Sequence, residues 1–157
     1  MKIHYYLFGL VSLISINAFA ADIAQCSNPS GKSYYPYHGL ISKNSSGWSD
    51  DGIKGGLTKV TVDETGKYDV IFVDTTKNII SSRADGGEVL LYARGSNSFG
   101  IVVIYPQKTI ETYNFIKNNA GTLEYFQTTT RAGDEVSMIK GSLLKGSCSY
   151  INFNLLK

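Results

Sequence analysis

The sequence has few of the residues that usually bind metals or form covalent catalytic sites. It contains two cysteines and two histidines, and His4 lies in the apolar N-terminal segment, so that His38 is the only histidine in the rest of the chain. Cys26 and Cys148 are too far apart in the sequence to resemble the ligand spacing of a zinc site. No Gly-x-Ser-x-Gly sequence and no cofactor-binding motif is present. We therefore expect neither a metal nor a cofactor.

An excess of charge of one sign is also missing. Lys and Arg number 15 against 13 Asp and Glu, a formal net charge of +2, and the two signs are interspersed. Proteins that bind nucleic acids usually present a clustered basic face. The charge pattern thus argues against nucleic acids and acidic membrane surfaces as partners.

Long apolar runs are absent except at the start of the chain. Residues 5–16 are mostly apolar, follow Lys2, and precede the small-residue pattern Ala18-Phe19-Ala20. This order predicts a signal peptide, residues 1–20, cleaved after Ala20. Because the run is shorter than the roughly 20 residues of a spanning helix, a membrane anchor fits less well. We expect residues 21–157 to form one soluble domain that is secreted or periplasmic.

The two cysteines support export. Cys26 and Cys148 lie just inside the two ends of the predicted domain, and an oxidising compartment would allow them to pair. A disulfide closing a loop of that length stabilises a fold by roughly 4 to 5 kcal/mol in the chain-entropy model.

The middle of the chain predicts antiparallel β structure. Residues 57–63 and 68–74 are rich in β-branched and aromatic residues, and Glu64-Thr65-Gly66 between them is typical of a hairpin loop. Short connections, which force neighbouring strands to be antiparallel, also separate four further predicted strands: residues 88–93, 99–105, 109–116 and 123–130.

Several of these strands are apolar on both faces, as residues 101–105 show. A sheet with one solvated face would alternate more regularly, so the sheet is expected to curl or to pack against another layer. The prediction is an all-β barrel or sandwich. The final segment is ambiguous: Val136, Ile139 and Leu143 fit one short helix, but a last strand leading into Cys148 fits equally well.

The most unusual segment is rich in aromatic residues. Tyr34, Tyr35, Tyr37 and Trp48 lie close together in the sequence. Such rings could form a binding surface, because they stack on sugars and proteins while their polar tips form hydrogen bonds. The alternative, which the sequence favours, is that they close one end of the barrel or cover the sheet.

The same segment offers weak catalytic candidates. His38 with Asp50 or Asp51 could form a small hydrolase site, but no nucleophile is identified by its spacing. Asn44 with the two aspartates could bind calcium, although a turn explains these residues more simply. Whether the protein is an enzyme stays uncertain, and the sequence favours a negative answer.

Two threonine-rich stretches, residues 108–112 and 128–131, are interpreted as solvated strand faces. The leading hypothesis is therefore an exported, non-enzymatic binding protein. Its partner would be a small apolar ligand in a barrel cavity, a glycan, or a secreted or envelope protein. A hydrolase and a structural component of an envelope assembly are the alternatives.

Overall fold

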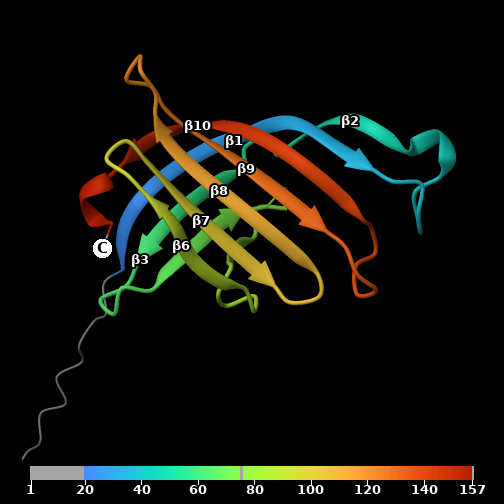
Figure 1. Ribbon diagram of the computed structural model, residues 1–157, viewed down its shortest axis with the longest axis horizontal. Helices are drawn as coiled ribbons and strands as arrows, with labels where there is room; N and C mark the ends of the chain where they lie inside the picture. The colour runs from blue at the N-terminus through green and yellow to red at the C-terminus, as the bar shows by residue number, and fades with distance from the viewer. Residues whose placement is uncertain (1–19, 75, 157) are drawn as a thin grey trace, which may run out of the picture.

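The protein folds as a single all-β domain (Figure 1). The computed structural model describes residues 20–74 and 76–156, so that the predicted signal peptide lies outside the described residues except for Ala20. The described residues contain two short 3-10 helices, η1 (Lys43–Ser45) and η2 (Phe153–Leu155), and no α-helix. The ten strands are β1 (Ala21–Tyr35), β2 (Gly47–Gly52), β3 (Leu57–Val62), β4 (Tyr68–Val73), β5 (Ile79–Ser81), β6 (Glu88–Arg94), β7 (Ser98–Tyr105), β8 (Thr109–Lys117), β9 (Leu123–Arg131) and β10 (Lys140–Ile151).

All ten strands belong to one antiparallel sheet that curls into a half-barrel. The main order is β5-β4-β3-β1-β10-β9-β8-β7-β6, and β2 pairs with β1 outside this path. This order has two free ends, and the curl brings β4 beside β6. The first and last strands, β1 and β10, are thus neighbours in the middle of the sheet, as Figure 1 shows.

The predicted strands are confirmed. The β3–β4 hairpin pairs Leu57 with Val73 at one end and Val62 with Tyr68 at the other. Strands β6 to β9 form the expected meander. The ambiguous C-terminal segment becomes strand β10 instead of a helix, because it forms a long ladder with β1 on one side and β9 on the other.

Strands β1 and β2 were not predicted. β1 contains Pro29, which lacks an N–H group, and Asn28, whose φ of 52° is left-handed. Both lie where the register between β1 and β10 shifts, between Ser27 and Ser30. The backbone N–H of Asn28 donates to Gly56 across this irregularity. Pairing on both sides therefore holds as a strand a segment whose residues suggest a loop.

The curl explains why several strands are apolar on both faces. In β7, Ile101 and Val103 are fully buried on the inner face, whereas Val102 and Ile104 are half-buried on the outer face. No second layer of described residues covers the outer face, where apolar side chains such as Leu143 are more than half exposed. The prediction of a barrel or sandwich is thus resolved as a half-barrel.

One end of the half-barrel is filled by aromatic rings. The ring of Phe115 stacks between Phe99 and Tyr125, with centroid distances of 4.6 Å and 5.7 Å. The edge of Phe153 in η2 closes the stack against Phe99 at 6.2 Å. The hydroxyl of Tyr125 lies 3.3 Å from Oγ1 of Thr58 on β3, which gives this buried group a hydrogen-bond partner.

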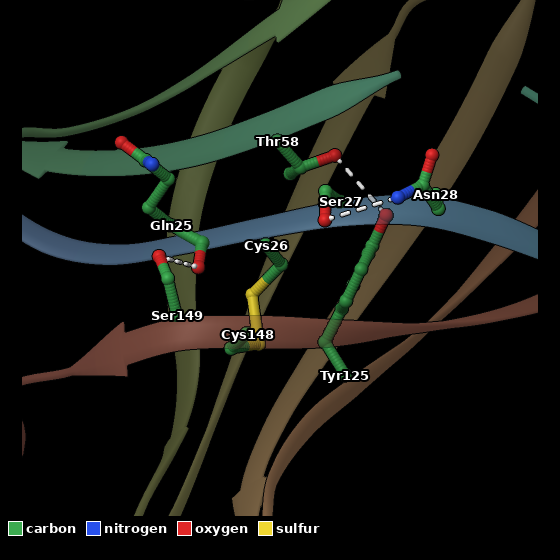
Figure 2. Close-up of a disulfide and its surroundings, with 8 residues drawn as sticks. All are labelled: Gln25, Cys26, Ser27, Asn28, Thr58, Tyr125, Cys148 and Ser149. Atoms are coloured by element: carbon green, nitrogen blue, oxygen red, sulfur yellow. Dashed lines mark hydrogen bonds between the residues drawn. A yellow bond between two sulfur atoms is a disulfide. The ribbon is translucent and has the colours of Figure 1, made fainter. Parts of the chain in front are cut away.

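The predicted disulfide is present beside this stack (Figure 2). Cys26 on β1 and Cys148 on β10 are register partners, so the bond joins the two central strands of the sheet. Cys26 is buried, and the neighbouring Ser149 hydroxyl donates to the carbonyl of Gln25 at 3.2 Å. A structural disulfide of this kind indicates an oxidising compartment outside the cytoplasm.

Candidate functional site

The inner face of the sheet changes from apolar to polar with distance from the aromatic stack. Side chains alternate between the two faces of a strand, so the residues two and four before Phe115 in β8, Tyr113 and Glu111, also point inward. Across the ladders, the inward positions opposite them are Gln127 and Thr129 on β9. The polar end of the inner face is therefore assembled from neighbouring strands of the meander.

Two adjoining cavities lie at this polar end. Their volumes are about 200 Å³ and about 280 Å³, and Phe72, Glu111 and Arg131 line both of them. The wall of the smaller cavity on β8 to β10 is mainly polar, with Leu144 as an apolar member, whereas Phe72 on β4 supplies an apolar ring on the other side. Each cavity taken alone is smaller than a typical site for a drug-sized ligand, and the smaller cavity has both polar and apolar surface.

Glu111 is a carboxylate placed where water has limited access. The Tyr113 hydroxyl donates to its Oε2 at 2.7 Å. Burial raises the pKa of the Glu111 carboxyl, although the Tyr113 hydrogen bond and the positive charges of Arg131 and Lys140 act in the opposite direction. Glu111 is thus a polar group whose charged form the protein solvates incompletely.

Asp51 is the second carboxylate of the smaller cavity, and its charge is compensated. Burial acts to raise the pKa of Asp51, but hydrogen bonds from Ser33, Lys140 and the Gly52 N–H outweigh it and leave that pKa lowered. The Lys140 ammonium lies 3.1 Å from Oδ2 of Asp51. Asp51 and Lys140 therefore neutralise each other within the site.

Arg131 differs from Lys140 in this respect. Arg131 lines both cavities, yet no described acidic side chain lies within 4.0 Å of its guanidinium to form a salt bridge. The charge of Arg131 acts on Glu111, which is diagonal to it by two positions in the β8–β9 ladder, and Asp85 and Glu135 also line the larger cavity. The half-buried Arg131 is therefore available to a negatively charged group in the cavity.

Replacement of Glu111 with glutamine is expected to increase the free energy of unfolding at neutral pH. The raised pKa means that the folded state disfavours the carboxylate relative to the unfolded state, while a glutamine oxygen can still accept the Tyr113 hydrogen bond. As the pH falls, wild-type Glu111 becomes protonated, and the difference between the two proteins should vanish below about pH 4. Urea unfolding over a pH series measures this difference.

Glu124→Gln provides a control of opposite sign. The Lys145 ammonium lies 2.6 Å from Oε2 of Glu124, and its hydrogen bond lowers the pKa of that carboxyl. The charged form of Glu124 therefore stabilises the fold above its unfolded pKa, so that this variant should be less stable at neutral pH and should match wild type in acid. A Glu111→Gln variant that loses stability at neutral pH would contradict the assignment of Glu111.

The aromatic residues of the predicted binding segment do not form one cluster. Tyr34 and Trp48 are cross-strand partners on the outer face of β1 and β2, with ring centroids 5.4 Å apart. Tyr35 points inward, and its hydroxyl lies 3.4 Å from Oδ2 of Asp51. Tyr37 lies in the exposed connection between the two strands. The expectation that the rings close the barrel or cover the sheet is wrong for Tyr34, Tyr37 and Trp48, which are 44%, 69% and 72% exposed.

The catalytic candidates are likewise separated. Asp50 and Asp51 are consecutive residues of β2, so their side chains point to opposite faces of the sheet. Asp50 forms an exposed salt bridge with Lys32, whereas Asp51 lines the cavity. His38 is exposed in the connection between β1 and β2. At most one of the two aspartates can therefore share a site with His38, and Asn44, in η1, is not part of either strand face.

The main residues of the cavity were missed because of their threonine-rich surroundings. Residues 108–112 and 128–131 were interpreted as solvated faces, but Thr109 and Thr129 are buried on the inner side with Glu111 and Arg131. The signal that could have identified Glu111 is its spacing, since it is separated by two and four positions from the core residues Tyr113 and Phe115.

Among the described residues, the helical segments lack the length and apolar character needed to cross a membrane. Comparison of the chain with protein-family models, with curated proteins and with solved structures finds no match.

Proposed function

We propose that this chain is an exported, non-enzymatic protein that binds a small polar ligand in the two adjoining cavities of its half-barrel. The observation that carries this proposal is the pair of cavities about the half-buried Arg131, which forms no salt bridge within the part of the chain that the structure describes. Buried charged groups are usually paired, because desolvating an unpaired charge is unfavourable. A ligand that supplies the missing partner would therefore be held in the cavity.

The lining favours a polar ligand over the small apolar ligand considered from the sequence. A purely apolar molecule would displace water from Glu111 and Arg131 without replacing its hydrogen bonds. The disulfide supports the part of the proposal that concerns export.

Native mass spectrometry of the protein isolated from its own compartment is the first test. We expect a bound small-molecule mass in the native spectrum that is absent from the denatured spectrum. The denatured mass also tests cleavage after Ala20. A Ser142→Leu variant, which places a larger apolar side chain in the smaller cavity, should lose the bound mass. Circular dichroism confirms that this variant is folded.

Two control variants separate this proposal from its alternatives. Trp48→Ala removes an exposed outer ring and should retain the ligand, and His38→Ala should do the same. Loss of the ligand in Trp48→Ala with retention in Ser142→Leu would place binding on the outer face and contradict the cavity. The proposal would be overturned if the native protein carries no bound mass and no member of a panel of small polar molecules raises its thermal stability.

A further inference from the structure

We infer that the cavity ligand is a small zwitterion with an apolar side chain, of the class of the aliphatic α-amino acids. This inference rests on the proposed function and names the ligand of that same site. It combines three features of the cavity lining: Arg131, which forms no salt bridge with a described residue, the carboxylate of Glu111 on the neighbouring strand, and the apolar ring of Phe72 on β4.

Arg131 supplies the site for the ligand carboxylate. The planar guanidinium can form two parallel hydrogen bonds with a carboxylate, which a lysine ammonium does not match. The other cation of the smaller cavity, Lys140, is already occupied by Asp51 at 3.1 Å. A negatively charged ligand group is therefore directed to Arg131.

Glu111 determines what must accompany that carboxylate. An acid without a positive group would bring a second negative charge close to Glu111, and like charges in a partly buried site repel each other. An ammonium group next to the ligand carboxylate would instead face Glu111 and form a charge-assisted hydrogen bond. The diagonal placement of Glu111 and Arg131 on neighbouring strands suits two opposite charges on one small molecule.

The apolar wall determines the rest of the ligand. This wall is the ring of Phe72 on β4, which lines both cavities opposite the polar strands, with Leu144 on β10 adding apolar surface to the smaller one. Burial of an aliphatic side chain against them removes apolar surface from water on both molecules. The cavity of about 200 Å³ limits this side chain to a short one, which favours leucine and its relatives over larger molecules.

Isothermal titration calorimetry with L-leucine and three analogues tests the inference on the complete mature protein. Leucinamide lacks the carboxylate, 4-methylpentanoate lacks the ammonium group, and glycine lacks the apolar side chain. We expect L-leucine to bind and each analogue to bind about tenfold more weakly or worse, since each loses one charged or apolar contact. Equal affinity of L-leucine and any one analogue would overturn the assignment of the corresponding contact.

Two variants assign the contacts to residues. Arg131→Gln should weaken the binding of L-leucine by about tenfold or more. It should leave the affinity for leucinamide unchanged, because leucinamide has no carboxylate to contact Arg131. Glu111→Gln should weaken the binding of L-leucine, whereas 4-methylpentanoate should bind with the same affinity or more tightly. Lys145→Gln, on the outer face, is the matched charge control and should change neither. If Lys145→Gln weakens the binding of L-leucine while Arg131→Gln and Glu111→Gln do not, the zwitterion binds elsewhere and the inference is wrong.

The experiment also separates this inference from the proposed function. If no amino acid binds, but the native protein retains another small molecule that Ser142→Leu excludes, the ligand class is wrong and the cavity function stands. If Ser142→Leu excludes nothing and no small molecule is retained, both are wrong.

Discussion

Replacement of both Cys26 and Cys148 with alanine is expected to lower the free energy of unfolding by about 4 to 5 kcal/mol. The two residues are separated by 122 positions, and the bond joins the two strands whose pairing closes nearly the whole chain. Without it, the unfolded chain gains the conformational freedom that the crosslink removes. Such a loss is a large part of the 5 to 15 kcal/mol that stabilises a typical domain. Guanidinium unfolding of the oxidised wild type and the double variant gives the difference.

Ser149→Ala is the control for local disturbance of this strand pair. It removes an exposed hydrogen bond to Gln25 beside the disulfide without changing chain connectivity, and should alter stability by less than about 1 kcal/mol. Reduced wild type should resemble the double alanine variant. A loss below about 1 kcal/mol in the double variant would show that crosslinking the unfolded chain contributes little.

Phe115→Ala is expected to lower the free energy of unfolding by about 3 to 5 kcal/mol. Phe115 is fully buried, and it is the ring that contacts both Phe99 and Tyr125 in the aromatic stack. Its truncation removes two ring contacts and leaves a cavity that the rigid sheet fills only in part. Urea unfolding monitored by far-ultraviolet circular dichroism measures the loss.

Ile110→Ala in the same strand provides the matched control. Ile110 points to the outer face of β8 and is 51% exposed, so its truncation creates no internal cavity. It should lower stability by less than about 1 kcal/mol. Equal losses for the two variants would contradict the conclusion that the ring of Phe115 fills the interior at this end of the half-barrel.

The sequence was most informative where structure is local. The β3–β4 hairpin and the meander from β6 to β9 have short turns and β-branched strands, so their pattern could be recognised without knowledge of the partners. β1 could not be recognised in this way, because Asn28 and Pro29 interrupt it and its strand conformation depends on pairing with β10, more than a hundred residues away. β2 is short and rich in aspartate and glycine, which are uncommon in strands.

The candidate site was less predictable than the fold for the same reason. Asp51, Glu111 and Arg131 come from three separate strands, and only the ladder register and the curl bring them to the lining of one cavity. The sequence instead drew attention to aromatic residues that are close to each other in the chain. Because side chains alternate along a strand, Tyr34 and Tyr35 lie on opposite faces of the sheet. One ring is exposed to solvent and the other points to the interior, so these aromatic residues do not form one cluster.

The position of β10 between β1 and β9 also has a consequence for biosynthesis. Before β10 emerges from the ribosome or the export channel, the unit of β1 to β5 and the meander of β6 to β9 have no strand that joins them in the sheet, since β10 lies between β1 and β9. The central pairing and the disulfide must therefore wait for the last-made strand. Vectorial synthesis thus delays formation of the complete cavity until almost the entire chain is available, and folding from the N-terminus onward does not produce it stepwise.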